Sequence, residues 1–319
     1  MNEVRYLSDD DKGQSLVSKL VVNLLTGVQA LVIFIPLLII NFLQVASIVV
    51  KPFSPKIFRA TNRFFANYYW ALLVFCLSYI GRIKVSIVGD DIPEKETVLI
   101  ESNHQNIADI PIMMVLAWQR KRLGDLKFFV KDVLKYIPGP GWGMLFLDCI
   151  FLKRNWLADK ARIEQTFENL KKNRIPFWLV SFLEGTRMTP EKLSKSQSFM
   201  KRRGLPHTNF VMAPRTKGFI ASIESLRSHI SAVYSVTLFY PEGIPSLWQF
   251  MAGQVDQVVF HVKRTPIDEV PEGTQDLENW ISDLYVGKDK FLTKANAFQV
   301  ENPNKIWTQE LYKQISGDS

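Results

Sequence analysis

An uncharged run near the start dominates the hydrophobic pattern of the chain: no charged residue lies between Leu20 and Val50. About 20 consecutive apolar residues can span a bilayer as a helix, so this run predicts a membrane anchor and not a buried core helix. Pro36, in the middle of the run, removes one helix hydrogen bond and leaves two geometries open. The anchor is either one kinked span or a hairpin that enters one leaflet and returns.

A second apolar stretch, Tyr68–Ile80, is rich in aromatic residues and too short to span a bilayer comfortably. Because Trp and Tyr favour the headgroup level, we interpret it as an interfacial helix, with a core helix as the alternative. Four cations without intervening acids lie between the two stretches: Lys51, Lys56, Arg59 and Arg63. The positive-inside rule places this flank in the cytoplasm, where the four cations would lie against anionic lipid.

Short apolar runs alternate with amphipathic stretches from Arg82 onward. The predicted strands are Ile83–Val88, Val98–Ser102, Leu126–Val130, Cys149–Leu152, Phe177–Leu183, Ile230–Phe239 and Gln257–Lys263. The predicted helices are Ile110–Trp118, Ala158–Lys171, Phe219–Ser228 and, as helix or loop, Glu191–Met200. Strands that alternate with helices predict an α/β fold with a mostly parallel sheet flanked by helices. We therefore expect an N-terminal membrane anchor in residues 1–81 and one α/β domain in residues 82–319.

The composition adds a basic balance to this picture. The 319 residues carry a net charge of +8, which suits anionic partners such as lipid headgroups, nucleic acid or nucleotide-bearing substrates. Cys76 and Cys149 lack the spacing of a zinc site, so no metal is expected, while a disulfide between them stays open. The segment Gly139–Gly143 lacks the spacing of a dinucleotide-binding loop and is interpreted as a turn. The sequence also contains no GxSxG motif of serine hydrolases.

The first candidate motif follows a predicted strand and opens a predicted helix: Asn103-His104-Gln105-Asn106-Ile107-Ala108-Asp109. Histidine titrates near neutral pH, so His104 can accept the proton of a hydroxyl group. A carboxylate on its other ring nitrogen would fix the tautomer and stabilise the imidazolium, and Asp109 is close enough in sequence to supply it. The alternative is that Asp109, which stands two residues before Pro111, only caps the helix.

Three further motifs place cations at the ends of predicted strands or at a helix start. They are Phe151-Leu152-Lys153-Arg154, Glu184-Gly185-Thr186-Arg187 and Pro214-Arg215-Thr216-Lys217-Gly218-Phe219. Ligands of open α/β sheets bind at the carboxyl ends of strands, and arginine can hold a phosphate through two parallel hydrogen bonds. Helix N-termini attract anions as well. Each motif alone is also compatible with an ordinary turn whose charges are solvated.

Together and in this order, the motifs resemble the four blocks of the glycerolipid acyltransferase family typified by 1-acylglycerol-3-phosphate acyltransferase. The NHxxxxD block is matched by Asn103, His104 and Asp109, and the FxxR block by Phe151 and Arg154. The EGTR block is matched by Glu184, Gly185, Thr186 and Arg187, and a looser proline block by Val211-Met212-Ala213-Pro214. The PRTKGF extension, the later VYSVTLFY and the stretch around Trp280 and Lys288-Asp289 look like one branch. That branch holds bacterial inner-membrane members and lysophospholipid acyltransferases of the endoplasmic reticulum.

The resemblance implies a mechanism. His104, oriented by Asp109, would deprotonate the free hydroxyl of a lysophospholipid, which attacks the thioester of acyl-CoA or of an acyl-carrier protein. No acyl-enzyme, metal or other cofactor is expected. Arg154, Glu184 and Arg187 would hold the glycerol phosphate of the acceptor. The other matched residues, expected in the substrate site, are Asn103, Phe151, Lys153, Gly185, Thr186, Pro214, Arg215 and Lys217.

The most specific expectation is 1-acylglycerol-3-phosphate as acceptor and phosphatidic acid as product. Three alternatives stay open: an acceptor with an inositol or glycerol headgroup, a hydrolase in which water replaces the acceptor, and a non-catalytic membrane lipid-binding protein. Membrane lipids are expected as partners, and nucleic acid is not. The resemblance and the basic flank together predict an integral membrane protein with a cytoplasmic catalytic domain. Its expected membrane is the bacterial inner membrane, with the endoplasmic reticulum as the alternative.

Overall fold

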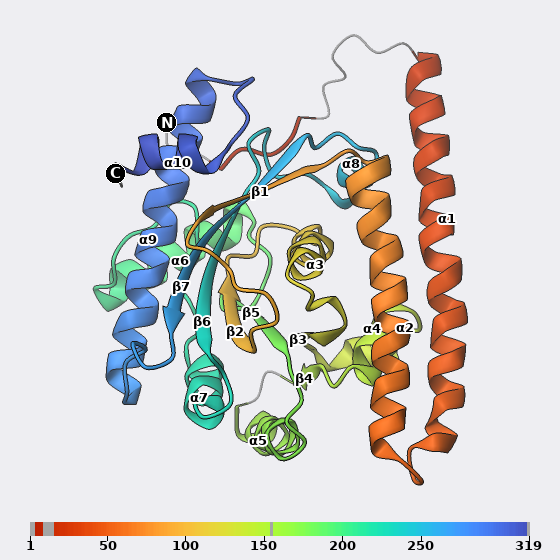
Figure 1. Ribbon diagram of the computed structural model, residues 1–319. Coiled ribbons are helices and arrows are strands. Elements are labelled where there is room, and N and C mark those ends of the chain that lie inside the picture. Colours follow the sequence, from red (N-terminus) through yellow and green to blue (C-terminus); the bar gives the residue numbers. More distant parts are fainter. Residues whose placement is uncertain (1–3, 9–15, 154–155, 318–319) are drawn as a thin grey trace.

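A seven-stranded sheet forms the centre of the computed structural model, which describes residues 4–8, 16–153 and 156–317 (Figure 1). The strands are β1 (Lys84–Gly89), β2 (Val98–Ser102), β3 (Leu126–Lys131), β4 (Ile150–Leu152), β5 (Trp178–Phe182), β6 (Ala232–Phe239) and β7 (Gln257–Pro266). Their order is β1-β7-β6-β2-β5-β3-β4, and every pair of neighbours is parallel except β6 and β7. The expected mostly parallel α/β fold is confirmed, with β1 and β7 running against the other five strands.

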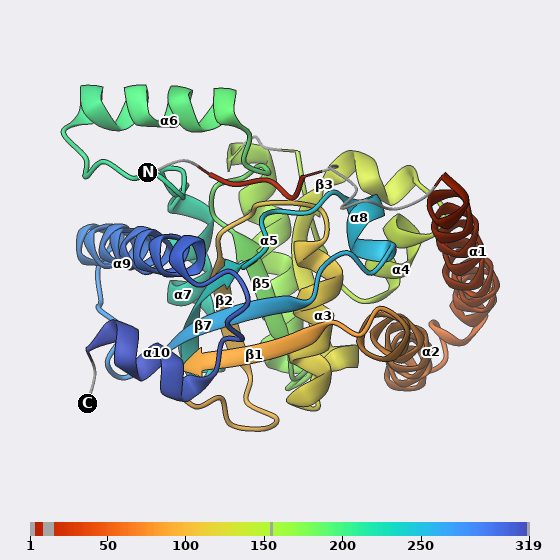
Figure 2. The ribbon, with the colours of Figure 1, turned by 90° about the horizontal axis from the view of Figure 1, so that it is seen from above.

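Helices cover both faces of this sheet (Figure 2). On one face lie α2 (Pro55–Phe75) and α3 (Asp109–Gln119), and on the other lie α5 (Trp156–Lys172), α7 (Lys217–Leu226) and α9 (Thr274–Glu301). Alternation along β2 separates the two cores, because Val98 and Ile100 pack on the α3 side while Leu99 packs on the α9 side. The central strand β2 is therefore enclosed by helices on both sides.

Four helices escaped the sequence-based prediction: α4 (Pro140–Phe146), α8 (Leu247–Met251), α9 and α10 (Gln309–Ser316). The interpretation of Gly139–Gly143 as a turn holds only for Gly139, because the residues from Pro140 onward form the start of α4. Gly139 precedes the helix with a φ of 91°, and Pro140 is its first residue, where the fixed φ of proline is favourable. Helix α6 (Pro190–Arg203) is capped by Thr189 and Gly204, and it stands apart from the other helices in Figure 2.

The N-terminal apolar run forms one continuous helix, α1 (Leu16–Ser47), which passes through Pro36 without reversing. A short 3-10 turn, Ile48–Val50, leads to α2, which packs beside α1 and runs in the opposite direction (Figure 1). The chain therefore reverses after the run and not at Pro36. The stretch Tyr68–Ile80 is no separate helix, because it is the last part of α2 followed by a π-helical turn.

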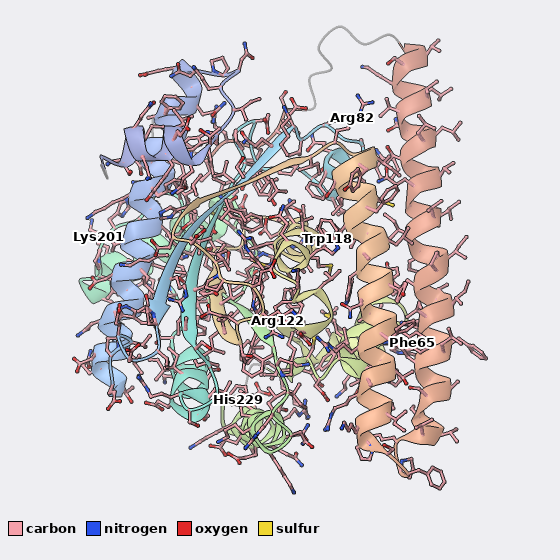
Figure 3. All side chains as sticks on the ribbon, in the orientation of Figure 1. Phe65, Arg82, Trp118, Arg122, Lys201 and His229 are labelled. Carbon is pink, nitrogen blue, oxygen red and sulfur yellow. The ribbon has the colours of Figure 1, made fainter. Side chains whose placement is uncertain are left out.

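The outer face of α1 is apolar and exposed. The exposed fractions of Phe42, Leu20 and Leu24 are 73%, 72% and 67%, and Figure 3 shows side chains of α1 projecting away from the rest of the molecule. Its inner face is partly polar, since the buried Asn41 side chain accepts a hydrogen bond from the Gly139 N–H at 2.7 Å. Within the described residues, α1 with its continuation to Val50 is the one helix long and apolar enough to cross a membrane.

Two of the four cations expected against lipid form ion pairs that hold α2 to the α/β domain. Arg63 lies 2.7 Å from the carboxylate of Asp125, and Arg59 lies 3.7 Å from that of Asp148. Asp125 also pairs at 2.9 Å with Arg122, which Figure 3 labels between α2 and the sheet. Both partners come from segments far away in the sequence, and the contact of Arg59 and Arg63 with anionic lipid stays a prediction. The other two cations are exposed.

Residues 4–8 lie on the α/β domain before α1 begins. The N–H of Leu7 donates to the carbonyl of Ile244, and the N–H of Ile244 donates to the carbonyl of Arg5, both at 2.9 Å. Both ends of the α1–α2 pair are thus tied to the same domain, one through residues 4–8 and the other through α2. A boundary between an anchor in residues 1–81 and a domain in residues 82–319 stays a prediction.

Candidate active site

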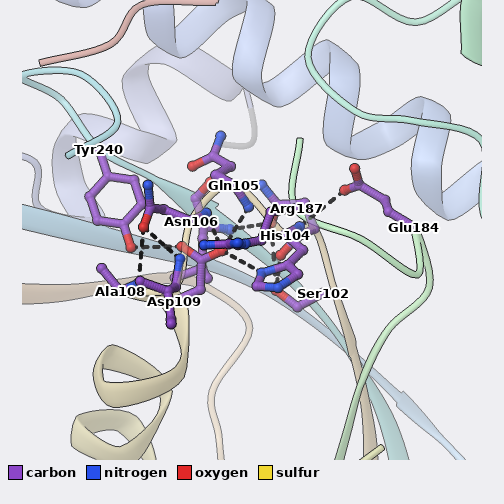
Figure 4. Close-up of polar contacts among 12 residues, drawn as sticks. Ser102, His104, Gln105, Asn106, Ala108, Asp109, Glu184, Arg187 and Tyr240 are labelled. Carbon is purple, nitrogen blue, oxygen red and sulfur yellow. Dashed lines mark hydrogen bonds and ion pairs between the residues drawn. The ribbon is translucent and has the colours of Figure 1, made fainter. Parts of the chain in front are cut away.

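His104 and Asp109 meet at the carboxyl end of β2, where the chain turns into α3 (Figure 4). His104 Nδ1 lies 2.9 Å from Asp109 Oδ2; the Asp109 side chain is fully buried, and that of His104 is 13% exposed. The other ring nitrogen, Nε2, has no hydrogen-bond partner in the described part of the chain. A general base needs this arrangement, in which a carboxylate orients one nitrogen and the second nitrogen is open to a substrate.

Backbone N–H groups fix the orientation of the Asp109 carboxylate. Gln105 and Asn106 donate their N–H groups to Oδ2 at 2.6 and 2.9 Å, and the Tyr240 hydroxyl donates to Oδ1 at 2.8 Å. Because these N–H groups require Oδ2 to be a hydrogen-bond acceptor, the Nδ1 atom of His104 also faces an acceptor. Nδ1 therefore carries the proton of the neutral imidazole. Asp109 is the first residue of α3 and binds N–H groups that precede the helix, so it does more than cap α3.

Two aromatic residues complete the support of this pair, and motif reasoning missed both. Tyr240 directly follows β6, and burial together with the adjacent Asp109 carboxylate raises its pKa. Its position at the end of VYSVTLFY is the one signal that the sequence offers. The Phe182 ring, at the end of β5, stacks on the His104 ring with 4.1 Å between centroids and 18° between planes. The histidine and the aspartate are therefore held from two different strands.

Glu184 joins three of the four motifs through backbone contacts. Its Oε1 accepts the N–H of His104 at 3.0 Å, and its Oε2 accepts the N–H of Met212 at 3.3 Å. Burial raises the pKa of Glu184 to about 8, while the two N–H groups oppose that rise. Both carboxyl oxygens are thus engaged by backbone N–H groups, which gives Glu184 a role in joining the loops, while its contact with the acceptor phosphate stays a prediction.

Arg187 lies beside His104. The N–H of Met188 donates to the His104 carbonyl at 2.8 Å, and this contact places the preceding Arg187, whose side chain is exposed, next to His104 (Figure 4). Lys192 fixes the same loop, because its ammonium donates to Thr186 Oγ1 at 2.9 Å and to the Arg187 carbonyl at 3.0 Å. These contacts hold the loop that places Arg187 next to His104.

A cavity of about 660 Å³ opens between α6 and the start of α7. Its lining combines the cations Lys192, Lys195, Arg215 and Lys217 with Glu184, Thr186, Phe199 and the segment Met212–Gly218. Gly185 shapes its edge, since it has a φ of +70° and a Cβ there would come within 3.1 Å of the Arg215 side chain. His104 does not line this cavity. The sequence did not point to Lys192, Lys195 or Phe199, which belong to no motif.

The remaining predicted site residues are Asn103, Phe151, Lys153 and Arg154. Asn103 is fully buried, and its side-chain amide exchanges two hydrogen bonds with the backbone of Leu238, at 3.0 and 2.8 Å. Phe151 is buried in β4, three strands from β2 in the sheet. Lys153 is exposed after the same strand, and Arg154 lies outside the described residues. Contact of these four residues with substrate stays a prediction, and Asn103 serves to tie the catalytic loop to β6.

Comparison with known proteins relates this chain to one family. The sequence matches the family model described as Acyltransferase over residues 84–236 and the one described as Acyltransferase C-terminus over residues 249–305. The 1-acyl-sn-glycerol-3-phosphate acyltransferase 3 of Arabidopsis thaliana is 34% identical over 282 residues, which cover 84% of this chain and 75% of that protein. The 1-acyl-sn-glycerol-3-phosphate acyltransferase gamma of Homo sapiens is 30% identical over 279 residues, which cover 86% and 73%.

The fold has a solved counterpart. The crystal structure of the 1-acyl-sn-glycerophosphate (LPA) acyltransferase PlsC from Thermotoga maritima matches 92% of this chain and 99% of its own, with a TM-score of 0.50 and 14% sequence identity. That identity is low enough for the likeness to speak for the fold alone. The sequence relatives speak for more, and they show that this chain is an enzyme of the 1-acyl-sn-glycerol-3-phosphate acyltransferase family.

Proposed function

We propose that the protein transfers a fatty acyl group from a thioester to the free hydroxyl of 1-acylglycerol-3-phosphate and releases phosphatidic acid. The observation that carries this proposal is the His104–Asp109 pair, with one imidazole nitrogen open and the exposed Arg187 beside it. The names of the relatives support the same reaction. The metal-free base chemistry of this pair suits an alcohol nucleophile.

The reaction balances without a covalent enzyme intermediate. His104 Nε2 takes the hydroxyl proton while the hydroxyl oxygen forms a bond to the thioester carbonyl carbon. The tetrahedral intermediate then collapses, the carbon–sulfur bond breaks, and the imidazolium returns its proton to the leaving thiolate. Asp109 stabilises the imidazolium through its hydrogen bond to Nδ1, which is 2.9 Å long.

We assign the phosphate of the acceptor to Arg187. The 2-hydroxyl oxygen and the phosphorus of 1-acylglycerol-3-phosphate are four covalent bonds apart, so they lie within about 5 Å of each other. A hydroxyl on Nε2 of His104 therefore brings the phosphate into the neighbourhood of His104, where Arg187 is exposed. Guanidinium binds a phosphate monoester through two parallel hydrogen bonds. A diester headgroup with inositol or glycerol offers one negative charge less.

We assign the phosphate-bearing part of the donor to the cationic cavity between α6 and α7. His104 does not line this cavity, and the cavity volume of about 660 Å³ is larger than a glycerol phosphate requires. Coenzyme A and the prosthetic group of an acyl-carrier protein both carry phosphate, so Lys195, Arg215 and Lys217 suit either donor. Inhibition by free 3′,5′-ADP would favour coenzyme A, and its absence together with competition by the free carrier protein would favour the carrier.

We propose that the exposed face of α1 lies in the membrane, while residues 4–8 and the α/β domain stay on one side of it. The docking of residues 4–8 at Ile244 and the packing of α2 on the α/β domain support this placement. Thioester donors are made in the cytoplasm, so we place the α/β domain there. The membrane is the bacterial inner membrane or, alternatively, that of the endoplasmic reticulum.

A panel of lysolipids tests the acceptor. Purified protein in lipid vesicles receives labelled acyl-CoA together with lysophosphatidate, lysophosphatidylinositol or lysophosphatidylglycerol. We expect the highest kcat/KM for lysophosphatidate. A higher kcat/KM for a diester acceptor would reassign the headgroup. Thioester hydrolysis at a rate that no acceptor changes would identify a hydrolase. Lipid binding without turnover would identify a non-catalytic protein.

A further inference from the structure

One turn of α9 lies directly behind the catalytic loop, on the face of the sheet opposite to α3. This turn, Tyr285–Asp289, contains Lys288 and Asp289, which the reaction does not use. Both side chains are buried, with 2% and 7% of the residue surface exposed. A buried lysine next to a buried aspartate is costly unless each has partners, so their contacts indicate what they do.

The ammonium of Lys288 joins the two central strands. It lies 2.9 Å from Glu101 Oε1 on β2, and it donates to Ser235 Oγ at 2.9 Å and to the Val236 carbonyl at 2.7 Å on β6. Glu101 and Ser235 are neighbours in the register of the two strands. An ammonium has three protons, and these contacts use all of them. Within the described residues, Lys288 is the one polar partner of the Glu101 carboxylate.

The neighbours of Lys288 hold the same region. The Tyr285 hydroxyl donates to the Ser102 carbonyl at 3.3 Å, two residues before His104. Asp289 Oδ1 accepts the N–H groups of Asn209 and Phe210 at 2.8 and 2.6 Å, just before the proline block. Glu184 joins that block to His104 through its two carboxyl oxygens. The turn of α9 and Glu184 therefore brace the same two loops.

We propose that Lys288 is a positioning residue for acyl transfer, which fixes the end of β2 and thereby the place of His104. Lys288 is too deeply buried to touch a substrate, so it acts through Glu101 and β6. We therefore expect the loss of Lys288 to lower the rate of the chemical step and to leave the binding of both substrates unchanged. This inference rests on the proposed function, since it is measured through the transfer reaction.

The test compares a variant that loses only the charge of Lys288 with a variant that loses the charges of both Lys288 and Glu101. Lys288→Met alone leaves the Glu101 carboxylate buried without a partner, so stability and activity should both fall. Glu101→Gln/Lys288→Met removes both charges at similar volume and should keep a thermal midpoint close to that of the wild type. We expect kcat of this double variant to fall about 10- to 100-fold, as for a displacement of about 1 Å, with both KM values within about twofold. The matched control is Lys290→Met, an exposed lysine on the same helix, which should behave as the wild type.

If the charge variants do not fold, a milder variant still tests the proposal. Ser235→Ala removes one of the three acceptors of Lys288 and should lower kcat about threefold without changing either KM. A folded double variant with wild-type kcat would overturn the proposal, and so would a loss confined to KM. If neither charge variant folds, wild-type kcat in Ser235→Ala overturns it. Absence of transfer by the wild-type protein with every lysolipid would instead reject the proposed function.

Discussion

Asp109→Asn separates two roles of the carboxylate, orientation and charge. Asparagine keeps one oxygen acceptor, and the N–H groups of Gln105 and Asn106 require that oxygen at the Oδ2 position. The amide nitrogen then faces the Tyr240 hydroxyl, which can turn to accept from it. The geometry therefore predicts that the tautomer of His104 survives this substitution and that only the negative charge is lost.

The size of the loss follows from Coulomb's law. Charges centred roughly 4 Å apart interact by about 4 kcal/mol at an effective dielectric constant of about 20. The imidazolium exists only after proton transfer, so this energy is lost mainly in the transition state, which corresponds to a kcat about 10³-fold lower. Both KM values should change little, and the thermal midpoint should stay near that of the wild type.

Initial-rate kinetics of purified Asp109→Asn, with thermal unfolding measured in parallel, checks this prediction. Asp109→Ala is the informative companion, because it leaves four donors without an acceptor, two of them fully buried, at about 1–3 kcal/mol for each buried donor, and it should unfold at a clearly lower temperature. A kcat of Asp109→Asn within threefold of the wild type would refute the electrostatic role. Complete loss of activity in folded protein would refute the argument that the backbone fixes the tautomer.

Three further predictions address the phosphate, the buried acid and the membrane. Arg187→Ala should raise the KM of lysophosphatidate about 10- to 100-fold and leave the donor KM unchanged, and Arg187→Lys should restore it only in part; a change confined to the donor KM would reassign Arg187. Burial raises the pKa of Glu184 from about 4.5 to about 8. Between these two pH values the folded state binds one proton more than the unfolded state, so the free energy of unfolding falls as the pH rises through this range. Glu184→Gln should flatten that part of the curve of thermal midpoint against pH, and an unchanged slope would contradict the assignment. Single cysteines can be introduced at Ser8 or Ser54 and labelled in sealed vesicles. We expect the cysteine at position 8 to be labelled from the cytoplasmic side, and the cysteine at position 54 to be labelled from the same side or to be protected from labelling. Labelling of position 8 only from the opposite side would contradict the placement of residues 4–8 beside the α/β domain.

Short apolar runs predicted each of the seven strands, because the strands of this sheet are short and largely buried. Val98–Ser102 was placed without error, and the helix after it differs from α3 by one residue at each end. The spacing of His104 and Asp109 across a strand-to-helix turn likewise predicted that they meet. These features are local, since each depends on residues a few positions apart.

The features that escaped prediction depend on partners far away in the sequence. Helix α9 buries Lys288 and Asp289 among its apolar positions, so two charges interrupt the hydrophobic pattern that would reveal a helix. Their partners lie on strands and loops that no local pattern connects with α9. Tyr240 contacts Asp109 across 131 positions, and Arg63 contacts Asp125 across 62, so charge or aromaticity alone could not assign either residue. The sequence pattern thus located the His104–Asp109 pair but not the contacts that support it.

The central claim is that His104 is the base for acyl transfer to lysophosphatidate, and one comparison tests it most directly. Wild-type protein and His104→Ala are purified, shown to have the same thermal midpoint and vesicle binding, and supplied with acyl-CoA and labelled lysophosphatidate. We predict that the wild type forms phosphatidic acid and that the variant forms it at least about 10²-fold more slowly, the contribution of a positioned general base. Phosphatidic acid formed by folded His104→Ala at the rate of the wild type would contradict the claim.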